Sequence, residues 1–133
     1  MRPNLVNFMM VGIGGFLGSC LRYAFTKLFA WFQLAFPYGT LLSNVLAGIV
    51  IGLILGLEQQ TVVIPPRTRL FLTTGLLGGL STFSTFSAET ILMLQDGKVL
   101  LAAGNVALNL GLSLIGVAAG ILLVKAVRTR ISL

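Results

Sequence analysis

Residues whose side chains could bind an ion or take part in chemistry are concentrated in one apolar stretch of this chain, between Gly75 and Glu89. It holds three glycines, five hydroxyl side chains, two phenylalanines three residues apart and one carboxylate. A plain membrane helix would carry Leu, Ile and Val here, and each glycine weakens a helix by about 1 kcal/mol relative to alanine. Backbone groups freed at membrane depth need protein or a cavity to satisfy them. The stretch predicts a broken helix that handles an ion, against the alternative of a packing interface of small residues.

Amide side chains mark two other apolar segments. Asn44 shares a helix face with Thr40 and with glycines at every fourth position after it. Asn109 and Ser113 continue a polar stripe that begins at Asn105. An amide in hydrocarbon costs free energy unless it is paired. Such a side chain can bond a neighbouring helix or offer its N–H donors to an anion in a pore, and the pattern leaves both interpretations open.

Arg22 falls towards the far end of the first apolar segment. A long cationic side chain in this position can extend to the membrane interface. It could instead place a fixed positive charge at the mouth of an anion path, or cap backbone carbonyl groups.

Composition sets the class of protein. Of the 133 residues 56% are hydrophobic and only 9% are charged, whereas soluble domains carry about 25% charged residues. The chain has no histidine and three acids, which argues against hydrolytic triads and zinc sites and predicts a protein that is not an enzyme. Cys20 is the single cysteine, so an intramolecular disulfide is impossible. The net charge of +6 sits mainly at segment ends, which indicates anchoring in membrane lipid and no nucleic-acid partner.

These residues must be positioned by an all-α membrane fold. The hydropathy pattern predicts one domain over 1–133, with four transmembrane helices spanning about 5–30, 39–57, 70–94 and 99–124 and a break in the third. Small residues at a spacing of four predict close helix packing. They occur at Gly14 and Gly18, at Gly48, Gly52 and Gly56, and at Gly116 and Gly120.

Basic residues are distributed unevenly between the two sides of such a fold. Only two basic residues, Lys27 and Lys98, lie on the side away from the termini. Six basic residues lie on the side of the termini: Arg2, Arg67, Arg69, Lys125, Arg128 and Arg130. This bias predicts cytoplasmic termini. A chain that inserts in both orientations is better served by a weak bias, so a heterodimer with an oppositely oriented relative stays open beside a homodimer.

Three motifs together resemble the Fluc (CrcB) fluoride channels. They are Gly14-Gly15-x-x-Gly18-x-x-x-Arg22-Tyr23, Gly39-Thr40-Leu41-x-x-Asn44-x-x-x-Gly48 and Gly75-x-x-Gly78-Gly79-x-Ser81-Thr82-Phe83-Ser84-Thr85-Phe86-Ser87. The resemblance covers most of the chain in order, and the last block is highly specific. It implies an antiparallel dimer that encloses two pores and passively exports fluoride across the inner (plasma) membrane of a bacterial cell, relieving fluoride toxicity.

The resemblance also implies roles for individual residues. Phe83 and Phe86 would contact fluoride through their electropositive ring edges, and Asn44 would be an amide donor at the pore. The backbone carbonyls of Gly78 and Ser81 would bind a structural sodium ion on the dimer axis. The complete candidate anion path consists of Phe83, Phe86, Asn44, Ser84, Thr85, Asn109, Ser113, Thr40, Glu89 and Arg22.

The sequence departs from the family pattern at a few positions. Ser81 stands where Thr is usual, and Asn105 and Asn109 stand where the family more often has Tyr and Ser. Two other functions stay open. A proton-coupled carrier of the small multidrug resistance type has the same size but needs an embedded Glu in its first segment, and this chain has no acid there. A non-conducting assembly subunit would explain the glycine faces but not the paired phenylalanines.

Overall fold

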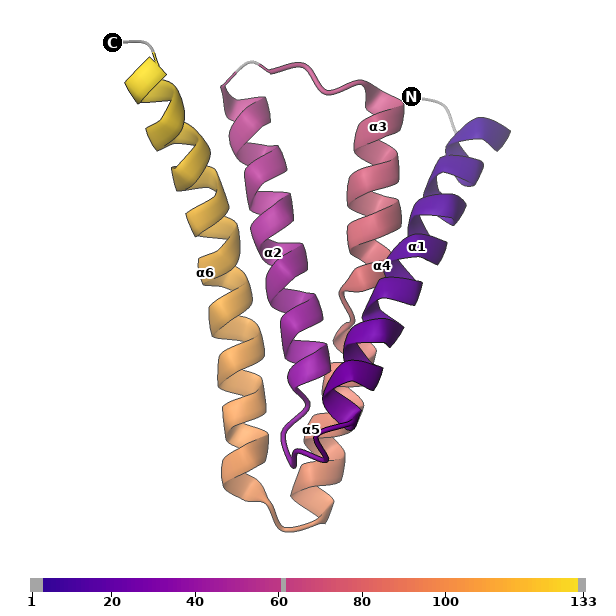
Figure 1. The fold of residues 1–133 in the computed structure, drawn as a ribbon, viewed down its shortest axis with the longest axis vertical. Helices are drawn as coiled ribbons and strands as arrows, with labels where there is room; N and C mark the ends of the chain where they lie inside the picture. The colour runs from indigo at the N-terminus through magenta and orange to yellow at the C-terminus, as the bar shows by residue number, and fades with distance from the viewer. Residues whose placement is uncertain (1–3, 61, 132–133) are drawn as a thin grey trace.

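The computed structural model describes residues 4–60 and 62–131, and these form an all-α membrane fold of four passes, three of which are single helices long and apolar enough to cross a membrane. Three passes are single helices: α1 (Leu5–Ala30), α2 (Tyr38–Gln59) and α6 (Val99–Ile131). The third pass consists of α3 (Pro66–Leu70), the π-helix η1 (Phe71–Leu77), α4 (Gly78–Leu80) and α5 (Phe83–Gln95), which follow one another through the molecule (Figure 1). The predicted break in the third pass is therefore present.

Two helices have different bounds from those expected. The third pass begins at Pro66 rather than at 70, because proline suits the first turn of a helix, where its missing N–H is no loss. The last helix continues to Ile131 rather than ending near 124, so Lys125, Arg128 and Arg130 extend it as a basic, exposed end. By length and composition α1, α2 and α6 can each cross a membrane; the divided third pass has no single helix of that length.

Local sequence signals fix the helix ends. The Asn4 side chain caps α1 by accepting the N–H of Asn7 at 3.0 Å. Between α5 and α6, Gly97 adopts a φ of 73° and ends α5 in the predicted turn. The Gly97 N–H donates to Leu94 O and the Lys98 N–H to Met93 O, the pattern of a Schellman cap.

The predicted glycine faces are packing surfaces. A Cβ on Gly14 would lie 2.5 Å from the Phe71 carbonyl oxygen of η1, and one on Gly79 would lie 2.5 Å from Gly15 O. On the other side of the molecule, a Cβ on Gly48 would lie 2.7 Å from Ser113 O of α6. Only glycine permits these approaches, which hold α1 against the broken pass and α2 against α6.

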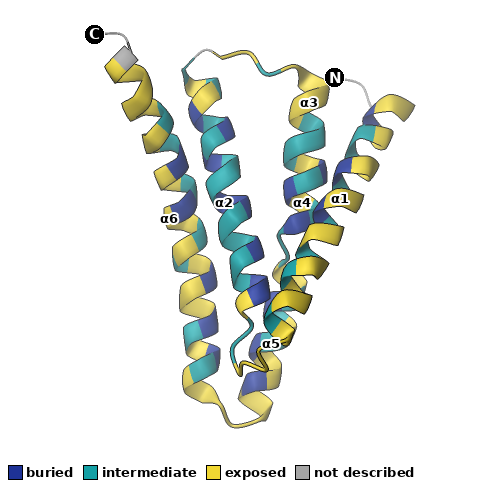
Figure 2. Cartoon of the chain, viewed as in Figure 1, coloured by how far each residue is buried: buried dark blue, intermediate teal, exposed yellow. Residues whose placement is uncertain are grey.

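The arrangement also places the charges as predicted. Both ends of the described chain lie at the same end of the molecule as the α2–α3 link, opposite the α5–α6 turn (Figure 1). Arg67 and Arg69 of α3 therefore share an end with the basic end of α6, while Lys98 lies at the other. Arg2 lies outside the described residues. Exposed positions dominate the outer faces of α1 and α6 (Figure 2), as expected for a multi-pass membrane protein.

Candidate functional site: a cavity at the helix break

The third pass breaks at Ser81 and Thr82, which are extended rather than helical. Their φ, ψ pairs are −76°, 152° and −151°, 116°. Helix α4 closes with the Ser81 N–H donating to Leu77 O at 2.9 Å. Helix α5 then starts afresh, because the Thr82 hydroxyl accepts the N–H of Thr85 at 3.2 Å and caps the new helix.

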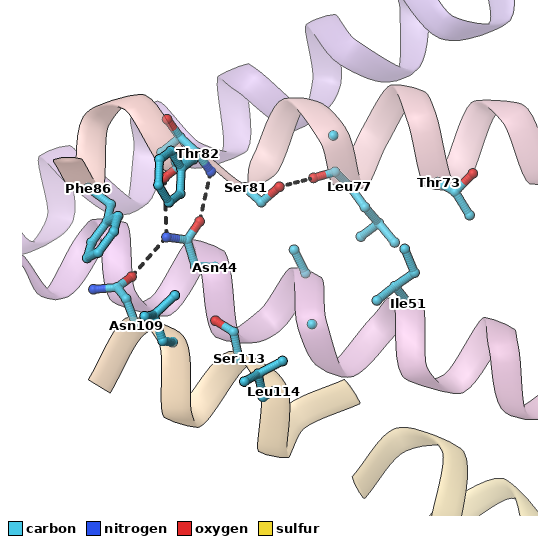
Figure 3. A pocket seen from close by; sticks show the side chains of 15 residues that line it. Asn44, Ile51, Thr73, Leu77, Ser81, Thr82, Phe86, Asn109, Ser113 and Leu114 are labelled. Carbon is cyan, nitrogen blue, oxygen red and sulfur yellow. Dashed lines mark hydrogen bonds between the residues drawn. The ribbon is translucent and has the colours of Figure 1, made fainter. Parts of the chain in front are cut away.

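Asn44 satisfies the backbone of this break from α2. Its Oδ1 accepts the Thr82 N–H at 2.8 Å, and its Nδ2 donates to Thr82 O at 3.4 Å (Figure 3). In an unbroken helix the Thr82 N–H would donate to Gly78 O. Asn44 therefore replaces the helical bond at the break, and Gly78 O is released from that role.

Arg22 supports the same break from α1. Its Nε donates to Gly79 O at 3.1 Å, and the residue is half-buried. This bond is the cap on a backbone carbonyl that was one of the roles left open for Arg22.

Phe83 and Phe86 stand together on the first turn of α5, as their spacing predicts. The ring centroids lie 5.6 Å apart and the ring planes are inclined by 57°. Phe86 is only 6% exposed, whereas Phe83 is 74% exposed in the single chain. One ring is thus held by the fold, and the other is presented at the surface of the protomer.

Both rings line a cavity of about 450 Å³ between α2, α6 and the broken pass (Figure 3). Its polar lining comes from Asn44, Thr73, Ser81, Thr82, Asn109 and Ser113, with the backbone of Gly48 and Gly78; Ala47, Ile51, Leu77, Leu110 and Leu114 make the rest of the wall with the two rings. Among the described residues, no charged side chain lines this cavity. The Ser113 hydroxyl is buried and has no hydrogen-bond partner among the described residues.

The polar stripe of α6 continues from the cavity into the protein. Asn44 Nδ2 donates to Asn109 Oδ1 at 2.8 Å, and Asn109 Nδ2 donates to Asn105 Oδ1 at 2.8 Å. Asn105 Nδ2 then donates to Thr90 Oγ1 at 2.9 Å, and the Thr90 hydroxyl donates to Phe86 O at 2.8 Å. We call Asn44, Asn109, Asn105 and Thr90 the amide ladder.

A second polar pair links α2 to α5 outside the cavity lining. The Thr40 hydroxyl donates to Glu89 Oε1 at 2.7 Å, and Thr40 is buried. Glu89 Oε2 is also buried and has no partner among the described residues. Ser84 and Thr85 lie one turn away, where their hydroxyl oxygens are 3.3 Å and 3.0 Å from Thr82 Oγ1.

The structure thus divides the predicted site residues into two groups. One cavity is lined by Phe83, Phe86, Asn44, Asn109, Ser113, Gly78 and Ser81; its lining does not include Thr40, Ser84, Thr85, Glu89 or Arg22. Sequence reasoning missed Thr90, which connects Asn105 to Phe86. Its spacing of four from Phe86 was an available signal, because a threonine hydroxyl can bond the carbonyl one turn back.

The cavity offers neutral donors and ring edges to an ion and no fixed counter-charge. Such donors can replace part of the hydration shell of a small anion without trapping it. Helix α5 begins at the cavity wall, and the N-terminus of a helix carries partial positive charge. The described residues contain no group of three His, Cys, Asp or Glu side chains that could hold a metal.

Comparison with known proteins gives consistent matches. The model of the family "CrcB-like protein, Camphor Resistance (CrcB)" matches residues 9–121. The chain is 48% identical over 124 residues to the "Fluoride-specific ion channel FluC" of Clostridium novyi (strain NT), an alignment that covers 92% of this chain and 97% of the relative. It is 46% identical over 123 residues to the protein of the same name from Paraburkholderia phymatum, with the same coverage of each chain.

A third relative of that name, from Clostridium perfringens (strain ATCC 13124), is 49% identical over 113 residues, which cover 84% of this chain and 88% of the relative. These names give no support to the alternatives of a proton-coupled carrier or a non-conducting assembly subunit. The family model covers most of the chain, and the alignments with the three relatives cover 84% to 92% of the chain. This chain therefore belongs to the CrcB-like protein family.

Proposed function

We propose that this protein is a fluoride-selective passive ion channel, and not an enzyme, that exports fluoride from the cytoplasm across the inner (plasma) membrane of a bacterial cell. The observation that carries the proposal is the ring pair Phe83–Phe86 beside a cavity that has polar, uncharged donors and lies at a helix break. Fluoride is small and strongly hydrated, so a selective path must compensate its hydration with several donors. The ring edges, the Ser113 hydroxyl and the start of α5 are suited to this task.

A growth assay tests export in a cell. The chain is expressed in a fluoride-sensitive bacterium that lacks its own exporter, and growth is followed over a range of fluoride concentrations. We expect the wild-type chain to restore growth, and Phe86→Ile to restore none at an equal membrane level. Loss of tolerance to fluoride but not to added chloride identifies the anion. Equal growth with and without the wild-type chain would contradict the proposal.

The working unit is proposed to be an antiparallel homodimer with two pores. Phe83 is 74% exposed in the single chain although it lies beside the cavity, which supports a second copy that covers it. The charge bias of six basic residues against two opposes dual insertion. Burial of the partner surface must then outweigh that bias.

Topology can be tested by cysteine labelling. Cys20 is exposed and is first replaced by serine. Single cysteines placed at either terminus are then labelled from outside with a reagent that does not cross the membrane. We expect about half of the molecules to react at each terminus. Labelling from one side only would favour a heterodimer with an oppositely oriented relative.

A structural sodium ion at the dimer axis is part of the proposal. The release of Gly78 O from its helical bond supports this site, and Gly78 is exposed while Ser81 is half-buried at the cavity. Two carbonyl oxygens from each chain suit a hard monovalent cation in a site without acidic ligands. When bound, the ion would neutralise the carbonyl dipoles at the break. We expect the dimer to be more stable in sodium than in potassium at equal ionic strength, as measured by dimer dissociation in detergent.

A further inference from the structure

The hydrogen bonds of the amide ladder all run in one direction. The Thr82 N–H can only donate, so it requires Asn44 to present Oδ1. Asn44 Nδ2 then faces Asn109, which must present its own Oδ1. The same argument fixes Asn105, and its Nδ2 faces the hydroxyl of Thr90. The hydroxyl hydrogen is left for Phe86 O. Each amide can take only one orientation while its neighbours keep theirs.

The inner part of the ladder is shielded from water. Asn105 is 0% exposed, Asn109 4% and Thr90 9%. A buried polar group that loses its partner bears the full cost of desolvation, which favours a ladder that is completely formed. The orientation set at the break is thereby linked to the turn of α5 that carries Phe86.

Asn109 has no N–H to spare for an anion. Its Nδ2 donates to Asn105 Oδ1 at 2.8 Å and to Asn105 O at 3.1 Å, and these bonds use both of its hydrogens. Asn105 does not line the cavity at all. Asn105 and Asn109 can therefore affect the ion only through the residues to which they are hydrogen-bonded, Asn44 and Thr90.

We infer that Asn105, Asn109 and Thr90 are positioning residues, which fix the Asn44 amide against the break and the Phe86 turn against α6 in the conformation that conducts. The inference rests on the proposed function for its effect on conduction, but the ladder itself can be tested without any flux. Breaking the ladder at its far end, at Thr90, should loosen the Thr82 N–H at the other end.

The decisive variant is Thr90→Val, which keeps the shape of the side chain and removes the hydroxyl. Thr90→Ser restores a hydroxyl and is the rescue. Ser43→Ala is the matched control, because Ser43 is 0% exposed and its hydroxyl donates to Gly39 O of its own helix at 2.8 Å. Two quantities are measured for each: hydrogen–deuterium exchange of the Thr82 amide by NMR, and fluoride flux per folded protein in liposomes.

For Thr90→Val we expect exchange at Thr82 to become about tenfold faster and flux to fall about tenfold, the effect of losing one buried hydrogen bond. Thr90→Ser and Ser43→Ala should stay within about twofold of wild type, a margin small beside that loss. If Thr90→Val does not fold, Thr90→Ala, which removes the hydroxyl with a smaller side chain, should give the same changes.

Several results would overturn the inference. Unchanged exchange at Thr82 in Thr90→Val would show that the ladder does not transmit orientation. Faster exchange at Thr82 with normal fluoride flux in Thr90→Val would show that the ladder has no role in conduction. Equal losses of flux and protection in Ser43→Ala would show that the effect of Thr90→Val is only a general loss of stability. Absence of flux in the wild-type protein would contradict the proposed function instead, and the exchange measurement would still decide whether the ladder exists.

Discussion

Gly48→Ala tests how the packing of α2 against α6 supports the site. The added Cβ would lie 2.7 Å from Ser113 O and 3.4 Å from Ser113 C and Cα. These are backbone atoms of α6, so no side chain can turn away to relieve the contact. Because ordinary van der Waals contact of a Cβ begins at 3.4 Å, the two helices must separate by roughly 0.7 Å.

The expected change in the free energy of unfolding of Gly48→Ala is the sum of two opposing effects. Overpacking of this kind costs about 1–3 kcal/mol, while replacing glycine by alanine within a helix gains about 1 kcal/mol. Gly111→Ala on α6 is the matched control, because nothing lies within 4 Å of its added Cβ and it keeps only the gain. We expect Gly48→Ala to be less stable than Gly111→Ala by about 2 kcal/mol, or about thirtyfold in the unfolding equilibrium.

The same separation acts on the site. Gly48 and Ser113 lie one turn from Asn44 and Asn109, whose bond of 2.8 Å would lengthen to about 3.5 Å, beyond the usual range for N–H···O. Unfolding in a denaturing detergent, followed by circular dichroism, measures the first effect, and fluoride flux measures the second. The reasoning is refuted if Gly48→Ala is as stable as Gly111→Ala, or if it conducts normally despite a loss of stability.

Four further substitutions have definite expected outcomes. Phe83→Ile and Phe86→Ile should each abolish fluoride flux in liposomes while leaving a folded dimer by size-exclusion chromatography, since isoleucine has no electropositive ring edge; flux near the wild-type level would contradict the pore assignment. Arg22→Gln should weaken the cap on Gly79 O and lower the free energy of unfolding by about 1–2 kcal/mol, as measured by detergent titration; a stability equal to wild type would argue against the cap. Gly97→Ala should cost about 1 kcal/mol because φ is 73° there, with flux per folded protein unchanged; a stabilised variant would contradict the turn geometry.

The fold was largely predictable, because hydropathy and glycine spacing report directly on membrane helices and their close contacts. The position of the break was harder. Glycines at 75 and 79 suggested flexibility, but both serve close approach to α1, and the backbone leaves the helix at Ser81 and Thr82. A glycine that permits a close contact and one that permits a break look alike in a sequence.

The candidate site was predictable in its residues but not in its bonds. Helical period places Asn44 and the stripe of Asn105, Asn109 and Ser113 on particular faces, and the structure confirms those faces. Period does not say which helix lies opposite. The interhelical bonds of Asn44, and the connection through Thr90 to Phe86, depend on the packing of three segments that are distant in sequence.

Fluoride efflux from liposomes that contain only the purified protein tests the central claim most directly. Vesicles loaded with potassium fluoride and potassium chloride are given a potassium ionophore, and both anions are followed with selective electrodes at equal pH inside and outside. A passive fluoride channel should give rapid fluoride efflux, negligible chloride efflux and no dependence on a pH gradient. Comparable efflux of both anions, or no fluoride efflux from a folded dimer, would contradict it.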